Sequence, residues 1–386
     1  MNKTCIIAEI GTSHQGDLGK AMELIHAAKE AGADTAKFQW VYADEIIHPK
    51  TGMVRLPTGD IPLYDRFRSL EQGPDFFARL MDECRRCGIE FLCTPFGVKS
   101  AMQLWQLGVK RFKIASPELN HLPLIELMAA TGLDLIVSSG VSRLADIEEA
   151  IETIQAARKG HLPHLSAFNP DLASDLLRKI PAKTSGSSGQ LGLGQFGAME
   201  AHPAITLLHC MTSYPAPESE YNLLLVRTLR GIFGVPTGIS DHSMDPLLVP
   251  VVSTILGGTI IEKHFTLSND TDGLDDPIAL VPRDFGAMVK AVRLVESHRQ
   301  RLPGCREIIG MTPMSQVETE VLEQLAMVDL EFDTAKIRTM LGNGIKTLAA
   351  SERDNYGRTN RSIHALGNLA KGTLLGPEHL SLLRTE

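Results

Sequence analysis

Short apolar runs rich in Val, Ile and Phe alternate along the chain with longer segments in which apolar residues recur every three to four positions. Runs of the first kind are typical of buried strands, and segments of the second kind of amphipathic helices. The pattern predicts eight strands, which cover Cys5–Ile10, Thr35–Gln39, Glu90–Cys93, Arg111–Ile114, Asp134–Ser138, Ile205–Cys210, Val235–Ser240 and Ile260–His264. Helices are predicted between them at Leu18–Ala31, Pro74–Arg86, Ala101–Leu107, Leu122–Ala130, Leu144–Ala157, Leu223–Phe233 and Pro246–Leu256, with a final one at Arg283–His298.

Eight strands that alternate with helices predict parallel βαβ units, and eight such units close into a (β/α)₈ barrel, the TIM-barrel class of α/β folds. Glycines lie just after several of the helical stretches and just before the next strand, where a helix ends most easily. These glycines are Gly32, Gly88, Gly108, Gly132 and Gly234. We therefore expect residues 1–300 to form one barrel domain.

Two regions depart from this rhythm. About 65 residues separate the fifth and sixth strands, more than a single helix with short loops needs, so an insertion is predicted over about 160–200. Its residues 183–197 are rich in Gly and Ser, which predicts a mobile loop. After the barrel, residues 301–355 are predicted to be a linker region. Residues 356–386 are too few to fold around their own core, so they should dock on the barrel or on a second subunit.

Composition narrows the function classes. The 386 residues include 38 Lys and Arg against 46 Asp and Glu, a net charge of −8, which argues against nucleic acid or an anionic membrane as the main partner. No run of 18 apolar residues occurs and the N-terminus lacks a basic segment, so a cytoplasmic protein is expected. The six cysteines are expected to be reduced. Cys84 and Cys87 have metal-like spacing, but adjacent turns of one helix explain it more simply than a zinc or redox site.

Polar residues gather where the predicted strands end, and in a barrel of this type the active site lies at that end. Two lysines, Lys37 and Lys113, stand inside otherwise apolar strands, where burial is costly unless they meet anions. Hydroxyl groups at further strand ends could complete a site for a phosphate and a carboxylate. These hydroxyls belong to Thr94, Ser116, Ser138 and Ser240.

Two histidines end neighbouring strands. His242 and His264 could approach one ion, because adjacent strands are about 4.8 Å apart. With Glu9 nearby, imidazole and carboxylate suit a divalent metal that keeps positions open for water or substrate. His14 and His209 are alternative ligands. The residues alone therefore predict metal-assisted chemistry on an anionic, phosphorylated substrate.

Short motifs in this order resemble the sialic acid synthase family, which includes pseudaminic and legionaminic acid synthases and spore-coat polysaccharide relatives. The motifs are Ala8-Glu-Ile-Gly11, His14-Gln-Gly16, Ala36-Lys-Phe-Gln39, Cys93-Thr-Pro-Phe96, Lys113-Ile-Ala-Ser-Pro-Glu118, Tyr214-Pro-Ala-Pro217, Gly238-Ile-Ser-Asp-His242 and Glu262-Lys-His264. The tail from Arg361-Ser-Ile to Glu378-His-Leu380 resembles the start of the antifreeze-like (SAF) domain that follows the barrel in that family. The resemblance implies a shortened version of that domain.

The resemblance implies a transferase that condenses phosphoenolpyruvate with an N-acetylated hexose aldehyde to a nonulosonic acid and phosphate. It also implies that the enzyme uses manganese or magnesium and that it is a homodimer. By motif, His242 and His264 would hold the metal, and Glu9 and Glu118 would manage water and protons. Phosphoenolpyruvate would be bound by Lys37, Thr94, Lys113, Ser116, Ser138 and Ser240. The sugar would contact Gln39, Phe96, Tyr214 and Asp275, and also Arg361 through the tail, which in the family reaches the partner subunit's barrel.

Three alternatives stay open. Lys113 could form a Schiff base, as in an aldolase, although two histidines and no general base beside it favour the metal route. The chain could be another phosphoenolpyruvate-dependent 2-keto-3-deoxy acid synthase. It could also be a non-catalytic barrel that binds the sugar or phosphoenolpyruvate. The acceptor sugar and the physiological metal are not defined by the sequence.

Overall fold

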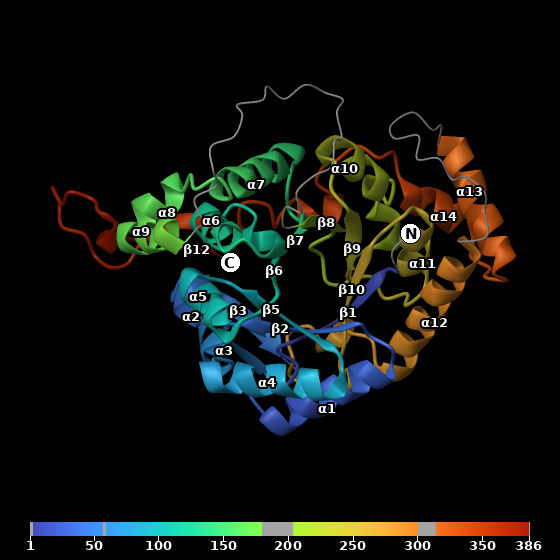
Figure 1. Cartoon of the computed structure of the whole chain (residues 1–386), viewed down its shortest axis with the longest axis horizontal. Coiled ribbons are helices and arrows are strands. Elements are labelled where there is room, and N and C mark those ends of the chain that lie inside the picture. The colour runs from blue at the N-terminus through green and yellow to red at the C-terminus, as the bar shows by residue number, and fades with distance from the viewer. Residues whose placement is uncertain (1–2, 57–58, 180–203, 300–313, 386) are drawn as a thin grey trace.

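Eight parallel strands enclose the centre of the molecule (Figure 1). The computed structural model describes residues 3–56, 59–179, 204–299 and 314–385. The strands are paired in the order β5-β2-β1-β10-β9-β8-β7-β6, and the two end strands β5 and β6 lie next to each other, so the sheet curls into a nearly closed barrel. The strands are β1 (Cys5–Gly11), β2 (Thr35–Trp40), β5 (Glu90–Pro95), β6 (Arg111–Ile114), β7 (Asp134–Ser138), β8 (Ile205–Cys210), β9 (Thr237–Asp241) and β10 (Ile260–His264). The predicted (β/α)₈ barrel is confirmed.

Helices surround this barrel and cover its outer face (Figure 1). Their apolar sides pack on the strands in one large buried core; on α10, for example, Leu225, Val226 and Leu229 are buried. Two of the predicted helix ends show why glycine stands there, because Gly88 and Gly108 have left-handed φ values of 64° and 81°. The helices are α1 (Leu18–Glu30), α4 (Pro74–Cys87), α5 (Val98–Leu107), α6 (Leu122–Ala130), α7 (Leu144–Ala157), α10 (Leu225–Phe233), α11 (Leu248–Ile255) and α12 (Pro282–Arg299).

Smaller elements fill the connections. Between β2 and α4 the chain forms the short elements α2 (Ala43–Ile46), β3 (Met53–Leu56), β4 (Gly59–Pro62) and α3 (Leu63–Ser69). The interval between β7 and β8 contains α8 (Pro163–Phe168) and α9 (Pro170–Lys179) after α7. The part of the predicted insertion at 183–197 lies outside the described residues.

The region expected to be a linker contains two helices, α13 (Met314–Met327) and α14 (Thr334–Leu341). Helix α13 packs on α11 and α12, and α14 packs on α13. Several of their apolar residues are fully buried, among them Val321, Ile337, Met340 and Leu341. This stretch is therefore a helical cover on the barrel, which its polar composition did not reveal.

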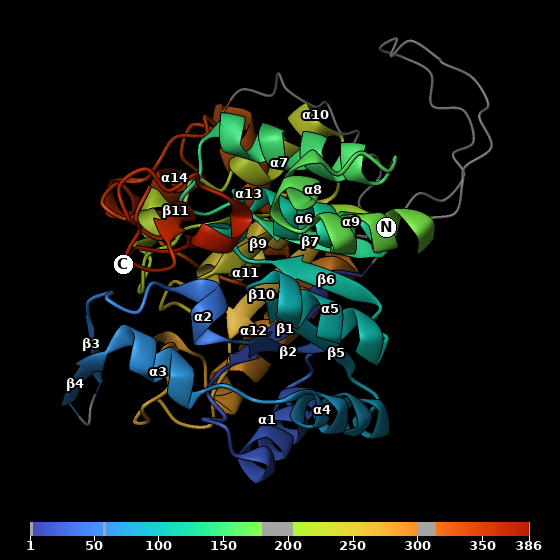
Figure 2. The ribbon, with the colours of Figure 1, turned by 90° about the vertical axis from the view of Figure 1, so that its left-hand side faces the viewer.

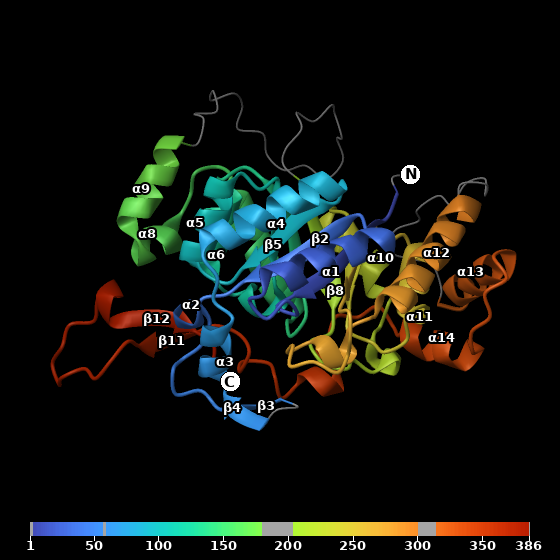
Figure 3. The same ribbon diagram turned by 90° about the horizontal axis from the view of Figure 1, so that it is seen from below.

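The last segment docks on the barrel that precedes it in the chain, one of the two predicted possibilities. The Glu352 carboxylate accepts hydrogen bonds from the backbone N–H of Val141 and of Thr212, both at 2.8 Å. Strands β11 (Ser362–Ala365) and β12 (Leu380–Leu383) then form an antiparallel pair, and Arg384 pairs with Ile47. The pair lies on the same side of the barrel as the β3–β4 hairpin (Figures 2 and 3). The antifreeze-like assignment of this tail stays a prediction.

None of the helices in the described parts of the chain is both long and apolar enough to cross a membrane.

Candidate active site

An apolar layer inside the barrel supports a polar layer above it. Alternate residues of a barrel strand point inward, and five of them form a separate buried cluster: Ile7, Leu92, Ile136, Leu208 and Ile260. Two residues further along each of these strands stand Glu9, Thr94, Ser138, Cys210 and Glu262, all buried. On five strands, the inward-facing residues thus change from apolar to polar at the same height in the barrel. This polar layer is the floor of the candidate site.

Both predicted lysines reach this floor. Lys37 Nζ lies 2.8 Å from Glu9 Oε2 and 3.5 Å from Glu262 Oε2, and it donates to Thr94 Oγ1 at 3.3 Å. Lys113 Nζ donates to Ser138 Oγ at 2.7 Å and lies 3.7 Å from Glu262 Oε1. The two lysines are only 3% and 2% exposed, so their charges are balanced by carboxylates rather than by water.

No role was predicted for Glu262, although it is part of the Glu262-Lys-His264 motif. Its carboxylate lies between the two lysines and accepts from Ser240 Oγ at 2.9 Å. Burial opposes its ionisation, yet the charges of Lys113 and Lys37 and the Ser240 hydrogen bond together lower its pKa. The signal was present in the strand, since Glu262 stands two residues before His264 and so faces the same interior.

The two predicted metal ligands lie side by side. The ring centroids of His242 and His264 are 5.2 Å apart, and Tyr214 stacks on His242 at 4.3 Å. Burial lowers the pKa of each histidine to about 4, so both imidazoles are neutral near pH 7. Neutral imidazole is the form that binds a metal.

The surroundings orient His242 in particular. Its Nδ1 hydrogen-bonds to the carbonyl oxygen of Met211 at 2.6 Å, which leaves Nε2 as the nitrogen that can bind an ion. Its backbone N–H donates to the Tyr221 hydroxyl, which in turn donates to Asp241 Oδ1. Asp241 also pairs with Lys263 Nζ at 2.6 Å. Asp241 and Lys263 therefore pack behind His242 and support it, rather than face the interior of the barrel.

A carboxylate lies beside His264. Asp275 Oδ2 lies 3.7 Å from His264 Nδ1, too far for a hydrogen bond. Burial raises the pKa of Asp275 to about 6. Two neutral imidazoles and one carboxylate are a ligand set that suits borderline divalent transition ions. The donor types at this place thus suit a metal of the predicted kind, although the ligand atoms of these three described residues do not form a compact group.

Three of the predicted residues meet around Gly11. A methyl group placed on Gly11 would lie 3.3 Å from Gln39 Nε2, 3.6 Å from Glu9 Oε1 and 3.7 Å from Asp275 Oδ2. Gln39 Nε2 also donates to Glu9 Oε1 at 2.7 Å. The backbone of Gly11 has a φ of 59°, a conformation that glycine adopts without strain. Gly11 therefore lets three polar side chains converge at the rim of the floor.

Ser116 lies on the other side of the mouth. Its Oγ accepts from the backbone N–H of Gly140 at 3.0 Å. A methyl group on Gly140 would meet Thr212 Oγ1 at 2.3 Å and Ser116 Oγ at 2.9 Å, so the glycine leaves these hydroxyls close together. Thr212 Oγ1 is buried without a hydrogen-bond partner among the described residues, which leaves it available to a ligand.

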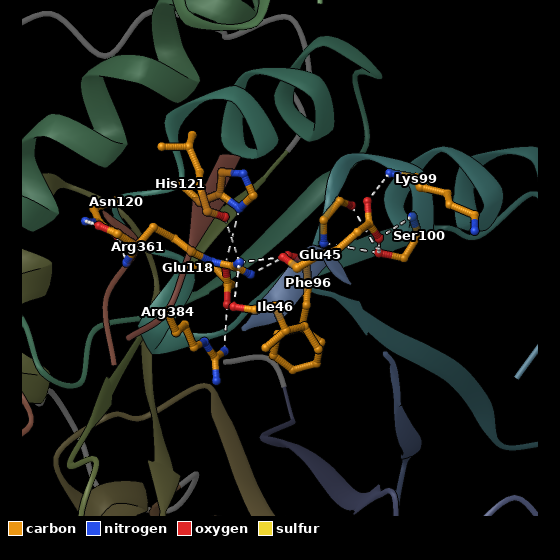
Figure 4. Close-up of polar contacts among 12 residues, drawn as sticks. Glu45, Ile46, Phe96, Lys99, Ser100, Glu118, Asn120, His121, Arg361 and Arg384 are labelled. Carbon is orange, nitrogen blue, oxygen red and sulfur yellow. Dashed lines mark hydrogen bonds and ion pairs between the residues drawn. The ribbon is translucent and has the colours of Figure 1, made fainter. Parts of the chain in front are cut away.

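Glu118 differs from its predicted role in proton transfer. It follows β6 in the short helix η1 (Ser116–Glu118) and is completely buried. Arg361 Nε binds its Oε2 at 2.5 Å, and Arg384 Nη2 binds its Oε1 at 2.6 Å (Figure 4). Although burial opposes ionisation, these two arginines hold the Glu118 pKa well below its usual range. A carboxylate that stays ionised and doubly paired is poorly suited to carry protons.

Arg361 contacts Glu118 of its own chain, and its contact with a sugar in a partner's barrel stays a prediction. It is 5% exposed and lies against its own chain. Phe96, also predicted at the sugar, accepts a hydrogen bond from Arg361 through its carbonyl oxygen, and its ring lies under Arg384 with 5.2 Å between centroid and Cζ. The docked tail thus places two guanidinium groups at Glu118, where the sequence suggested one at the sugar.

The cysteine pair lies away from this mouth, on the outer helix α4. Cys84 is buried, and Cys87 Sγ donates to Glu83 Oε1 at 3.6 Å. Glu83 also hydrogen-bonds His26 Nε2 at 2.6 Å and pairs with Arg86. His26, Glu83 and Cys87 are the one compact group of three potential metal ligands in the described residues. Their mutual hydrogen bonds account for the group without an ion.

Residues 24–301 match the model of the NeuB family. This chain belongs to the NeuB family. It is 29% identical to the N,N'-diacetyllegionaminic acid synthase of Legionella pneumophila over 386 residues, which cover 99% of this chain and 85% of that protein. The predicted membership of the sialic acid synthase family is confirmed. Like the Legionella synthase, this NeuB-family member is an enzyme.

Solved structures agree with this assignment. The spore coat polysaccharide biosynthesis protein SpsE of Bacillus subtilis superposes with a TM-score of 0.70 at 27% identity and covers 99% of this chain and 85% of its own. The N-acetylneuraminic acid synthetase of Leptospira borgpetersenii superposes with a TM-score of 0.59 at 26% identity, covering 86% of this chain and 94% of its own. The similarity to SpsE therefore extends beyond the barrel to nearly the whole chain.

Proposed function

We propose that this NeuB-family enzyme condenses phosphoenolpyruvate with the open-chain aldehyde of an N-acetylated hexose, such as N-acetylmannosamine or a 2,4-diacetamido-6-deoxyhexose. The products are a nonulosonic acid and inorganic phosphate. The observation that carries the proposal is the placing of two buried lysines and two neutral histidines at one barrel mouth. An anion site beside a metal-type donor set is what this reaction needs.

Phosphoenolpyruvate is a trianion, and the floor offers cations and hydroxyls to bind it. Lys37 and Lys113 point to the same carboxylate, Glu262, from opposite sides, so a bound anion would lie between or above them. Thr94 Oγ1 lies at Lys37, Ser138 Oγ at Lys113 and Ser240 Oγ at Glu262, and the predicted Ser116 hydroxyl lies at Gly140. In such a buried site, charged hydrogen bonds position the reactant and stabilise negative charge.

The aldehyde belongs on the histidine side. Gln39, Tyr214 and Asp275 lie between the floor and the opening, and Tyr214 is 51% exposed, so a sugar could reach them from solvent. His242 and His264 are the residues that would hold a manganese or magnesium ion. When bound, such an ion would act as a Lewis acid on the aldehyde.

The reaction forms one carbon–carbon bond and one carbon–oxygen bond from water, breaks the carbon–oxygen bond to phosphate, and protonates the aldehyde oxygen to a hydroxyl. C3 of phosphoenolpyruvate attacks the aldehyde carbon, water adds to C2, and the phosphate leaves with the oxygen that joined it to C2. Glu9 is the carboxylate assigned to orient that water, because it lies on the floor beside Lys37, the proposed ligand of phosphoenolpyruvate. Glu118 is assigned no part in these proton transfers, because both of its oxygens bind arginines.

Release of phosphate tests the proposal. The metal-stripped enzyme, with and without added manganese, would be assayed with phosphoenolpyruvate against N-acetylmannosamine, its 6-phosphate, a 2,4-diacetamido-6-deoxyhexose and an aldose phosphate without an acetamido group. Metal-dependent release with one N-acetylated sugar supports the proposal. Release only with the plain aldose phosphate would indicate another phosphoenolpyruvate-dependent keto acid synthase.

Two further results would contradict it. Binding of phosphoenolpyruvate without release on any sugar would indicate a non-catalytic barrel. Covalent trapping of substrate on Lys113 by borohydride would indicate a Schiff base, which the proposed route does not use. The homodimer and the cytoplasmic location stay predictions, and light scattering of the full chain would measure the first.

A further inference from the structure

Asp276 is a completely buried carboxylate at the mouth of the barrel. It begins the short helix η3 (Asp276–Ile278), in the loop that connects β10 to α12. Two hydroxyl groups bind its two oxygens, because Ser13 Oγ donates to Oδ1 and Thr271 Oγ1 donates to Oδ2. Ser13 lies in the turn after β1 and is only 4% exposed. The Asp276 carboxylate therefore joins two loops of the mouth.

The rest of the β10–α12 loop is folded around Asp276. Asn269 Nδ2 donates to the carbonyl oxygens of Asp276 and Ala279, at 2.7 and 2.8 Å. The backbone N–H of Asp276 donates to the carbonyl oxygen of Gly273 at 3.3 Å. A methyl group placed on Gly273 would overlap the Asp276 carboxylate, so the glycine leaves room for that side chain. Asp276 is thus held through both its side chain and its backbone.

A buried cation on the neighbouring helix α3 faces the same loop. The Arg66 side chain is largely buried, and its Nη2 donates to the carbonyl oxygen of Asp272. Burial lowers the pKa of Arg66, and the charges of Asp272 and Asp276 oppose this effect. The Arg66 charge therefore offsets part of the cost of burying a carboxylate at Asp276.

Asp275, the residue before this anchored carboxylate, is held differently. Its Oδ2 lies 3.7 Å from His264 Nδ1, and this is the one close polar contact of its carboxylate within the described parts of the chain. No hydrogen bond to the side chain fixes its place there. The position of Asp275 is therefore set by the backbone, and the planar peptide bond to Asp276 connects it directly to the anchored residue.

We propose that Ser13, Thr271 and Asp276 form a clamp that positions the Asp275 carboxylate beside His264, within reach of the metal ion and the acceptor sugar. The inference rests on the proposed function and adds three positioning residues to it. None of the three touches the ion or the sugar. Removal of either hydroxyl would leave a buried oxygen of Asp276 without its partner, and the loop that carries Asp275 would shift.

Manganese binding to the metal-stripped enzyme, measured by calorimetry, tests the clamp without turnover. Thr271→Val removes the hydroxyl and keeps the branched shape, and Thr271→Ser keeps the hydroxyl, so the two variants are a matched pair. We expect Thr271→Val and Ser13→Ala each to raise the manganese dissociation constant about tenfold, as is typical for residues that support a metal ligand. Thr271→Ser and the exposed control Ser297→Ala should stay within about twofold of the unmodified enzyme.

Phosphoenolpyruvate binding provides the internal comparison. Its dissociation constant should stay within about twofold in all four variants, because the clamp does not contact Lys37 or Lys113. An equal loss of manganese and phosphoenolpyruvate binding would indicate general disturbance of the barrel and would overturn the proposal. Unchanged manganese binding by Thr271→Val and Ser13→Ala would overturn it as well.

The dependence on Asp275 separates positioning from a purely structural role. Asp275→Asn should itself raise the manganese dissociation constant. Ser13→Ala or Thr271→Val added to Asp275→Asn should cause no further rise, because both act through that carboxylate. Circular dichroism would show that each variant is folded, and if Ser13→Ala does not fold, the Thr271 pair carries the test alone. A further rise of similar size in the Asp275→Asn background would overturn the proposal.

Failure of the clamp can be distinguished from failure of the proposed function. No phosphate release by the unmodified enzyme with any sugar would refute the proposed function, and the calorimetric comparison would still test the clamp because it needs no turnover. Metal-dependent release by the unmodified enzyme, together with unchanged manganese binding by the clamp variants, would overturn the clamp alone. An unmodified enzyme that binds no manganese would overturn the clamp's role toward the ion.

Discussion

Replacing Glu262 by glutamine removes one negative charge from between two buried lysines and keeps the shape of the side chain. Its oxygens lie 3.5 Å from Lys37 Nζ and 3.7 Å from Lys113 Nζ, and only Glu9 would remain to balance both cations. The side chain is 5% exposed, so water cannot replace the lost charge. We expect the unliganded protein to become less stable.

The size of the loss follows from the distances. At an effective dielectric constant of about 20, charges this close attract each other by roughly 4 to 5 kcal/mol per pair. The cost of burying the carboxylate offsets part of that attraction, and breaking a buried ion pair from one side typically costs about 3–5 kcal/mol. We expect the free energy of unfolding to fall by that amount, a large fraction of the roughly 5–15 kcal/mol of an ordinary domain.

Although the unliganded Glu262→Gln variant should be less stable, its affinity for phosphoenolpyruvate should not fall. Without Glu262, the two lysines compete less for their carboxylates and are available to an added anion. The dissociation constant for phosphoenolpyruvate should therefore stay the same or fall, and the ligand should raise the melting temperature of Glu262→Gln more than that of the unmodified enzyme. Denaturant unfolding and titration calorimetry would measure the two quantities.

The matched control is Glu331→Gln, an exposed carboxylate outside the barrel, which should change stability by less than about 0.5 kcal/mol. Full stability of Glu262→Gln would show that the lysines are not held by this carboxylate. Weaker binding of phosphoenolpyruvate by a folded Glu262→Gln would show that the lysines are not the anion site. Either result would contradict the role assigned to Glu262 and the two lysines at the floor.

Three further predictions concern other parts of the site and its supports. Burial lowers the pKa of His14 to about 4 and of His209 to about 3 from an unfolded value of 6.5, so both histidines contribute their full stability above pH 6.5. As the pH drops from 6.5 toward 4, the free energy of unfolding should fall by up to about 1.4 kcal/mol per pH unit per histidine. Constant melting temperatures between pH 7 and 5 would contradict this. Gly11→Ala adds a methyl group at a φ of 59°, which should cost about 1–2 kcal/mol and lower kcat/KM by disturbing Glu9 and Gln39; unaltered kinetics would show that their convergence is unimportant. Lys113→Ala should weaken phosphoenolpyruvate binding far more than manganese binding, measured by calorimetry, and equal losses would contradict the separation of the two subsites.

Much of the fold could be predicted because each strand and helix carries its own local signal. The predicted strands Asp134–Ser138 and Ile260–His264 have the bounds that the structure gives them. The strand predicted from Val235 begins only at Thr237, after Pro236, which has no N–H for a ladder hydrogen bond. Helices α13 and α14 were missed because their apolar stripes are short and interrupted by charged residues.

The floor of the site was predictable for the same local reason, and the tail was not. Residues that stand two positions after an apolar strand residue face the interior, and this rule reaches Glu9, Thr94 and Ser138 and also the missed Glu262. The pairing of Glu118 with Arg384 joins residues 266 positions apart. Nothing near either residue encodes that contact, so the motif alone suggested a free carboxylate.

The fate of C3 of phosphoenolpyruvate shows whether the enzyme forms the proposed carbon–carbon bond. Phosphoenolpyruvate labelled with carbon-13 at C3 would be incubated with the enzyme, manganese and the active N-acetylated sugar, and its NMR signal would be followed together with phosphate. The account predicts that the vinyl signal becomes the methylene signal of a 3-deoxy keto acid, with one phosphate per product. Conversion to the methyl signal of pyruvate, or phosphate release without a new carbon–carbon bond, would contradict it.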